Sequence, residues 1–111
     1  MIRIGPAGNS ERFYEEGHKR SEQAPAWLRA MGLSAMEYSA GRGVTLSEPT
    51  ARAIGEAARA HDIQMSIHAP YYINCATDEP EKQQNTLTHF QKAAAAIDQM
   101  GGDRLIFHIA A

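Results

Sequence analysis

The chain has 111 residues, enough for one small domain but far fewer than the roughly 250 residues of a closed (β/α)8 barrel. Its formal net charge of −2 excludes the strongly basic composition of a general polyanion-binding protein. Alanine supplies 19 residues, whereas leucine, isoleucine, valine and phenylalanine together supply 18. We therefore expect a core built largely from small side chains.

Four short runs have the composition of β-strands, and helical patterns separate them. The runs are Ile2–Gly5, Ala35–Ser39, Ile63–His68 and Arg104–Ile109. They end at intervals of roughly 30 to 40 residues, which is the size of one βα unit. Strands that alternate with helices of this length indicate right-handed crossovers and a parallel sheet.

The first two helical patterns carry clear start and stop signals. One has Pro25 in its opening turn and stops at Gly32. The other begins after Ser47, a typical N-cap residue, and ends near His61. Both are therefore predicted as crossover helices.

The third helical pattern is the longest. It begins around residues 78–80 and stops at Gly101 and Gly102. Helical spacing places one apolar stripe toward the core, formed by Leu87, Phe90, Ala94 and Ile97.

The predicted strands are apolar on one face and polar on the other. In the third strand Ile63, Met65 and Ile67 alternate with polar residues that point the opposite way. A sheet covered by helices on both faces would instead be apolar throughout. The polar face therefore suggests a barrel interior, in which we expect a buried network of Arg3, Glu37 and Gln64.

Two histidines, His68 and His108, lie at the carboxyl ends of predicted strands. Ligands and catalytic groups converge at this rim in parallel α/β folds. Two imidazoles on neighbouring strands can bind one metal ion, with carboxylates or water completing the shell. The alternative is that both histidines are structural.

The segment at residues 68–74, HAPYYIN, resembles the His-Ala-Pro-Tyr segment of the endonuclease IV family. These enzymes are zinc-dependent apurinic/apyrimidinic endonucleases built on a (β/α)8 barrel. Residues 105–108 are similar to the next metal-binding strand of the family. Residues 35–38 and 41–44 are similar to its second strand and the loop that follows. The resemblance covers residues 1–111 in register and implies the first half of such a barrel, an α/β fold with strand and helix order β-α-β-α-β-α-β.

The resemblance implies roles for five residues. His68 and His108 would bind the same zinc ion of a three-zinc cluster, and no catalytic residue separate from the metal ligands is implied. Tyr71 and the adjoining Tyr72 would lie on a loop that probes the minor groove of DNA. Arg42 would lie on the loop that enters the gap around a flipped abasic nucleotide. The sequence departs from the family after His108, where Ile-Ala-Ala replaces the usual Pro-Gly.

The implied function is the N-terminal part of a zinc-dependent endonuclease that cleaves the phosphodiester 5′ to abasic sites in double-stranded DNA. The remaining ligands of the family are expected on later strands, so residues 1–111 alone should be inactive and should bind zinc weakly. Two alternatives remain: a metal-dependent sugar isomerase or epimerase on the same barrel, and a noncatalytic half-barrel module. Open sheet edges also allow a homodimer.

The sequence favours a cytoplasmic protein. Cys75 is the only cysteine, so no intrachain disulfide can form. The first residues lack the apolar core of a signal peptide, and no run approaches the length of a membrane helix.

Overall fold

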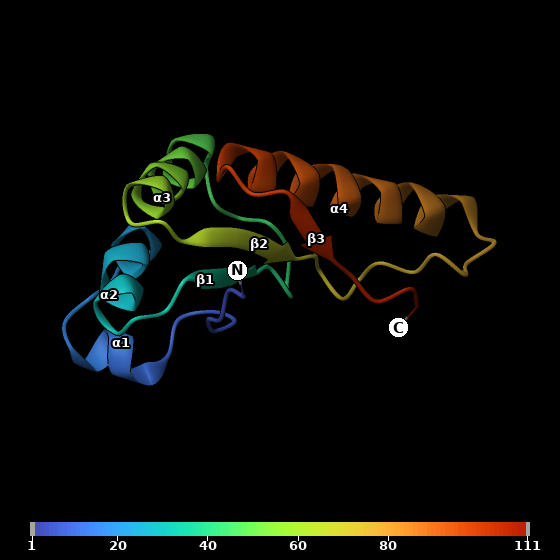
Figure 1. The fold of residues 1–111 in the computed structure, drawn as a ribbon. Helices are drawn as coiled ribbons and strands as arrows, with labels where there is room; N and C mark the ends of the chain where they lie inside the picture. Colours follow the sequence, from blue (N-terminus) through green and yellow to red (C-terminus); the bar gives the residue numbers. More distant parts are fainter. Residues whose placement is uncertain (1, 111) are drawn as a thin grey trace.

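The computed structural model describes residues 2–110 and contains a three-stranded parallel sheet with helices packed against it (Figure 1). The strands lie in the order β1-β2-β3, with the bounds Ala35–Ser39, Gln64–His68 and Arg104–Ile106. The helical elements are α1 (Glu11–Glu15), the 3-10 turn η1 (Ser21–Gln23), α2 (Ala24–Ala30), α3 (Glu48–Ala60) and α4 (Pro80–Gln99). The predicted α/β fold with parallel strands is confirmed. In residues 2–110 no helix is long and apolar enough to cross a membrane.

The sheet buries one face against α3 and α4. Met36 of β1 pairs in register with Met65 of β2, and both are 2 % exposed. Ile67 is fully buried, whereas Gln64, Ser66 and His68, which alternate with these residues, are only partly buried. The predicted alternation in this strand is therefore confirmed, and small helical residues close the core around it, namely Ala51, Ala58, Ala93 and Ala96.

The first predicted strand, Ile2–Gly5, is not a strand in the structure. The segment runs parallel to β1: Ile4 O accepts from the Ala35 amide at 3.2 Å, and Pro6 O accepts from the Glu37 amide at 3.0 Å. Pro6 has no N–H to donate to Ala35 O, so the ladder is interrupted and a single bridge remains at Ala7. We call residues 2–8 the N-terminal edge.

The fourth predicted strand is shorter than expected. β3 ends at Ile106, whose carbonyl oxygen accepts from the Ala69 amide at 2.8 Å. The next available amide of the β2 side, that of Tyr71, donates instead to Gly41 O at 3.1 Å. The ladder cannot continue, and residues 107–109 leave the sheet.

The three predicted helices are present as α2, α3 and α4, but the buried face of α4 differs from the prediction. Ser47 caps α3, its hydroxyl accepting from the Thr50 amide at 3.3 Å. In α4, however, Leu87 is 49 % exposed and Ala94 is exposed. The buried face of α4 is rotated by one position from the predicted apolar stripe, because α4 packs against both β2 and β3. This face consists of Thr86, Ala93, Ala96 and Ile97.

The short helix α1 and the turn η1 were not predicted from the sequence. Ser10 caps α1 by accepting a hydrogen bond from the Phe13 amide. Phe13 is fully buried and packs edge-to-face against Trp27 of α2, with ring centroids 5.4 Å apart. One anchored aromatic residue thus fixes a helix too short to give a periodic pattern.

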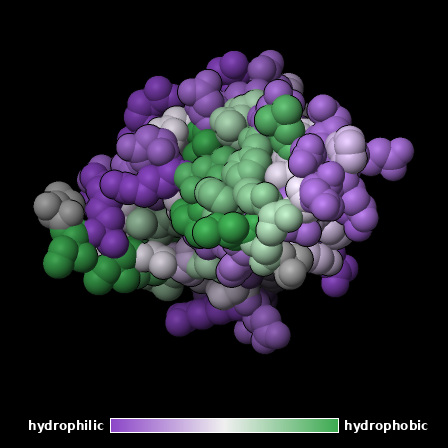
Figure 2. Space-filling model, turned by 90° about the vertical axis from the view of Figure 1, so that its right-hand side faces the viewer, coloured by the Kyte–Doolittle hydropathy of each residue, from purple (hydrophilic) through white to green (hydrophobic). Residues whose placement is uncertain are grey.

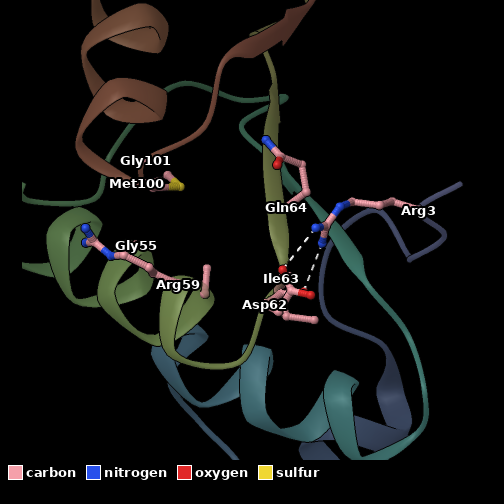
Figure 3. A pocket seen from close by; sticks show the side chains of 9 residues that line it. Arg3, Gly55, Arg59, Asp62, Ile63, Gln64, Met100 and Gly101 are labelled. Atoms are coloured by element: carbon pink, nitrogen blue, oxygen red, sulfur yellow. Dashed lines mark hydrogen bonds and ion pairs between the residues drawn. The ribbon is translucent and has the colours of Figure 1, made fainter. Parts of the chain in front are cut away.

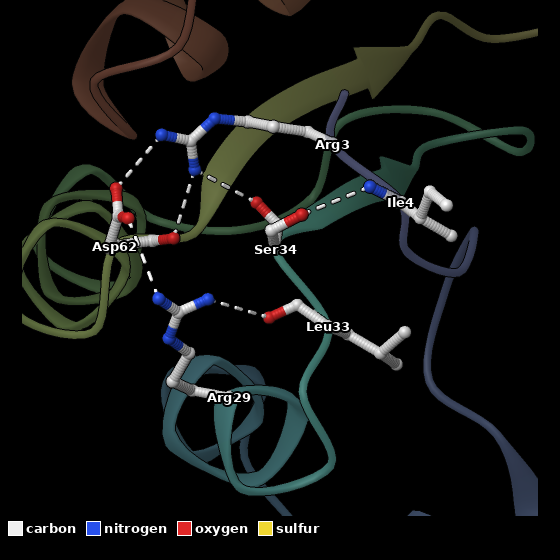
Figure 4. A network of polar contacts seen from close by, with 6 residues as sticks. All are labelled: Arg3, Ile4, Arg29, Leu33, Ser34 and Asp62. Carbon is white, nitrogen blue, oxygen red and sulfur yellow. Dashed lines mark hydrogen bonds and ion pairs between the residues drawn. The ribbon is translucent and has the colours of Figure 1, made fainter. Parts of the chain in front are cut away.

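The expected network of Arg3, Glu37 and Gln64 is wrong. Figure 4 shows the Arg3 guanidinium turned to the amino end of β2, where it donates to the Asp62 carboxylate at 2.9 Å and to the Asp62 and Ser34 carbonyls. The hydrogen bond from Arg3 lowers the pKa of Asp62. Gln64 instead donates to Asp103 at 3.3 Å. Asp62 has a φ of 54° and lies in the tight turn before β2. Its carboxylate binds the Arg3 guanidinium there, so the guanidinium does not extend over the polar face of the sheet.

Candidate functional site

The carboxyl ends of the strands form one rim, and backbone hydrogen bonds join the loops that leave it. The Ala40 amide, just after β1, donates to His68 O at 3.0 Å. The Tyr71 amide, after β2, donates to Gly41 O at 3.1 Å. Figure 2 views the side on which the strands end in Figure 1, and it shows an apolar area surrounded by hydrophilic side chains. Residues from three separate loops are therefore held in one place.

The rim brings the two predicted histidines together. The rings of His68 and His108 lie 5.2 Å apart between centroids, with an angle of 50° between their planes. His68 ends β2 and is partly buried, whereas His108 lies two residues beyond β3 and is exposed. The parallel register that pairs His68 with Ile106 accounts for this proximity.

The hydrogen bonding of His68 defines which of its nitrogens is available. Its Nδ1 lies 2.8 Å from the Ala69 carbonyl oxygen. A carbonyl oxygen can only accept, so Nδ1 carries the hydrogen and Nε2 of the neutral ring keeps its lone pair. An imidazole held in this way by a backbone carbonyl is the usual arrangement of a metal-binding histidine.

The pair fits one part of a zinc shell. Two imidazoles on one tetrahedral zinc, with Zn–N distances of about 2.0–2.1 Å, have ring centroids about 5 Å apart. The observed 5.2 Å agrees with this spacing. In residues 2–110, however, no three His, Cys, Asp or Glu side chains gather in a group that could hold a metal ion. The described chain therefore supplies two donors and lacks the rest of a shell.

The other three candidate residues also lie at this rim. Tyr71 and Tyr72 contact each other, with ring centroids 4.6 Å apart, and are 51 % and 44 % exposed. The adjacent Tyr71 hydroxyl raises the pKa of Tyr72, and Arg42 is near enough to oppose that shift. Tyr71, Tyr72 and Arg42 lie on the loops that follow β2 and β1, and we call these three residues the Tyr-Arg cluster.

His89, to which sequence reasoning assigned no role, also contacts this cluster. It lies on α4, and its ring centroid is 5.5 Å from that of Tyr72. Its Nδ1 is buried without a hydrogen-bond partner among the described residues. Nothing in the sequence around His89 distinguishes it, because the contact depends on how the loop after β2 folds back on α4.

Two cavities are lined by residues other than the two histidines. One, of about 240 Å³, is at the amino ends of the strands between Arg3, Arg59 and Gln64 (Figure 3). The other, of about 260 Å³, lies between β1 and α1, and no charged side chain lines it. Burial and the nearby Tyr14 raise the pKa of Tyr38 there. Its lining consists of Gly8, Asn9, Tyr14, Ser21, Met36, Tyr38 and Ser39.

Comparison with known proteins shows the family of this chain. The sequence pattern of the family described as "Xylose isomerase-like TIM barrel" matches residues 25–111. The chain belongs to the xylose isomerase-like TIM barrel family. This agrees with the strand order and with the site at the carboxyl ends of the strands, and the described sheet is a partial barrel of that family.

The chain is also similar to one curated protein in sequence and to one solved structure in fold. "Uncharacterized protein MJ0133" of Methanocaldococcus jannaschii is 37 % identical over 81 residues, which are 73 % of this chain and 29 % of that protein. A crystal structure of D-psicose 3-epimerase with D-tagatose from Clostridium cellulolyticum H10 superimposes with a TM-score of 0.69 and 10 % identity, covering 83 % of this chain and 32 % of the epimerase. At that identity the likeness concerns the fold alone. The chain spans about a third of the length of either protein.

Proposed function

We propose that this member of the family contributes the first metal ligands and the first DNA-contacting loops of an endonuclease IV-type enzyme, which cleaves the phosphodiester 5′ to abasic sites in DNA. The observation that carries the proposal is the histidine pair, with ring centroids 5.2 Å apart at the rim, on the same edge as the loops that carry the exposed Tyr-Arg cluster. The histidines suit a metal, and the cluster suits a nucleic acid.

The histidine pair supplies two of the ligands that a zinc site needs. His68 and His108 would hold one zinc ion through neutral imidazole nitrogens, with Ala69 O fixing the orientation of the first ring. Zinc supplies a hydroxide nucleophile at neutral pH and stabilises negative charge on a phosphodiester. Further ligands must come from outside residues 1–111, so we propose that this chain alone does not cleave DNA.

The Tyr-Arg cluster would provide the contacts to DNA. Exposed aromatic rings stack on bases or wedge into a widened groove, and a guanidinium binds phosphate. A missing base lowers the cost of distorting the duplex, because the abasic nucleotide has no stacking to lose. Tyr71, Tyr72 and Arg42 would therefore favour abasic over intact DNA.

The proposal is tested by fluorescence anisotropy with a labelled duplex that contains a tetrahydrofuran abasic analogue, compared with the same duplex with every base present. We expect tighter binding to the abasic duplex. Tyr71→Ala should weaken binding by about 5- to 160-fold, the range of one aromatic stacking contact. Arg42→Ala should reduce the slope of log affinity against log salt by about one.

Arg52→Ala is the matched control, since Arg52 is an exposed arginine of α3 that pairs with Glu48 rather than lying at the rim. It should leave both the affinity and the salt slope unchanged. Equal binding of the abasic and intact duplexes, together with no effect of Tyr71→Ala, would contradict the proposal.

A second candidate is a metal-dependent sugar isomerase or epimerase on the same barrel. The supporting observation is the cavity of about 260 Å³, whose lining residues include four that carry a hydroxyl and one that carries an amide, namely Tyr14, Ser21, Tyr38, Ser39 and Asn9. Hydroxyl and amide groups without charge suit a small polyol better than a phosphate. Saturable binding of D-tagatose that Tyr38→Phe abolishes, with no preference for abasic DNA, would favour this candidate.

A further inference from the structure

We propose that His89 of α4 is a positioning residue, which holds the ring of Tyr72 against that of Tyr71 in the arrangement that receives DNA. This role rests on the proposed function, since it gives the cause of the placement of two residues of the Tyr-Arg cluster. His89 acts through Tyr72 rather than on the nucleic acid.

The two tyrosines occupy the central positions of a tight turn, residues 70–73, which we call the tyrosine turn. The Ile73 amide donates to Pro70 O at 3.4 Å and closes it. Pro70 and Ile73 are buried, whereas the rings of Tyr71 and Tyr72 are about half exposed. The buried ends fix the backbone of the turn. They do not fix the rings, because exposed side chains exchange rotamers within nanoseconds unless another group contacts them.

Each ring of the tyrosine turn has its own support. The Tyr71 ring lies over Gly41, where an added Cβ would be 3.8 Å from Tyr71 Cδ1. The Tyr72 ring lies against His89, with centroids 5.5 Å apart and an angle of 34° between the planes. The two tyrosine rings contact each other at 4.6 Å. His89 is therefore the support that α4 gives to a row of three rings.

Thr86 anchors the chain on the same face of α4, one turn before His89. Its hydroxyl accepts from the Asn74 amide at 3.0 Å and donates to Asn74 O at 3.3 Å. Thr86 is only 8 % exposed. Residues three apart on a helix are neighbours, so this anchor holds the segment after the tyrosine turn beside the His89 ring.

His89 acts through the face of its ring rather than through its buried nitrogen. Its Nδ1 has no hydrogen-bond partner within residues 2–110. A buried polar atom without a partner costs free energy, so this nitrogen does not explain the contact. A phenylalanine ring would offer the same face without the unpaired nitrogen. His89→Phe should therefore keep Tyr72 in place, whereas His89→Ala should release it.

The size of the effect follows from the strength of one aromatic contact. Removing such a contact lowers the population of the held arrangement, and with it the affinity for a ligand of that arrangement, by about 2- to 12-fold. This is less than the loss expected for Tyr71→Ala. Because His89 acts through Tyr72, His89→Ala should weaken binding no further in a chain that already carries Tyr72→Ala.

The first test is made on the free 111-residue chain by nuclear magnetic resonance, with isotopically labelled tyrosine rings assigned through Tyr71→Phe and Tyr72→Phe. We expect a nuclear Overhauser contact between the two rings in the unmodified chain. His89→Phe should retain it, and His89→Ala should lose it. Gln91→Ala is the matched control, since Gln91 is an exposed, uncharged residue of α4 two positions along; it should retain the contact.

The second test is fluorescence anisotropy with the abasic duplex. His89→Ala should weaken binding by about 2- to 12-fold, and His89→Phe and Gln91→Ala should bind as the unmodified chain does. Should His89→Ala fail to fold, His89→Leu, which keeps bulk without an aromatic face, replaces it in both tests.

The two tests separate the positioning role from the proposed function. A contact between the tyrosine rings that survives in His89→Ala overturns the positioning role, whatever the DNA measurements show. Unchanged binding by His89→Ala while Tyr71→Ala weakens binding also overturns it, as does a further loss in the double variant with Tyr72→Ala. If the contact is lost but the unmodified chain binds both duplexes equally, the positioning of Tyr72 is supported and the proposed function is contradicted.

Discussion

Gly102 precedes β3 and determines how closely that strand approaches β2. A Cβ added there would overlap the Met65 carbonyl oxygen and would lie 2.6 Å from Ile97 Cδ1. Ordinary contacts begin near 3.4 Å, so Gly102→Ala requires a shift of about 1 Å at the start of β3. The Met65 oxygen belongs to the backbone of the central strand and cannot move alone. Overpacking of this kind costs about 1–3 kcal/mol of unfolding free energy.

Gly101 provides the matched control, because it is constrained for a different reason. Its φ is +73°, and no atom within 4 Å would meet an added Cβ. Gly101→Ala should therefore cost about 1–2 kcal/mol through backbone conformation, and Gly101→Asn should cost less, since asparagine adopts this region more readily. At Gly102 asparagine should be worse than alanine.

Urea denaturation followed by circular dichroism measures all four variants. The reasoning is refuted if Gly102→Ala is as stable as the unmodified chain, or if asparagine is tolerated better than alanine at Gly102.

Two other predictions concern charge and metal. The salt bridge to Arg3 lowers the pKa of Asp62 from its ordinary value of 3.8, so its contribution to stability is present above about pH 4 and is lost as the pH falls through the lowered pKa. The stability difference between the unmodified chain and Asp62→Asn, measured by urea denaturation, should therefore be present at pH 7 and disappear near pH 2; a constant difference would contradict this. Isothermal titration should show weak zinc binding that His68→Ala or His108→Ala abolishes and His61→Ala leaves intact, whereas tight stoichiometric zinc would exclude a two-ligand site.

Local sequence signals predicted the central part of the fold. Alternating burial in β2 and the Ser47 cap of α3 depend on residues close together in the chain, so composition and spacing reveal them. The proximity of His68 and His108 followed from one further rule, that parallel strands end at the same rim.

The errors arose where distant residues decide the outcome. Pro6 removes one amide from the N-terminal edge, and the consequence becomes visible only once Ala35 is known to lie opposite it. Arg3 binds Asp62, which is 59 positions away in the sequence, and therefore does not lie on the polar face of the sheet. His89 meets Tyr72 because a loop folds back on α4. Periodicity carries no information about such contacts.

The many alanine residues of the core bear on the geometry of the candidate site, because small side chains determine how closely the helices pack on the sheet. Small residues let the elements approach closely: a Cβ on Gly55 of α3 would lie 2.8 Å from the Met100 carbonyl oxygen, and Ala93 and Ala96 of α4 are buried in the core beside β2 and β3. Close packing holds α4 on β2 and β3, and the register of these strands brings the two imidazoles near each other, with ring centroids 5.2 Å apart. A larger side chain at Ala93 should separate α4 from the sheet and displace β3, which ends two residues before His108. Small residues of the core thus help to place the strands from which the proposed metal ligands follow.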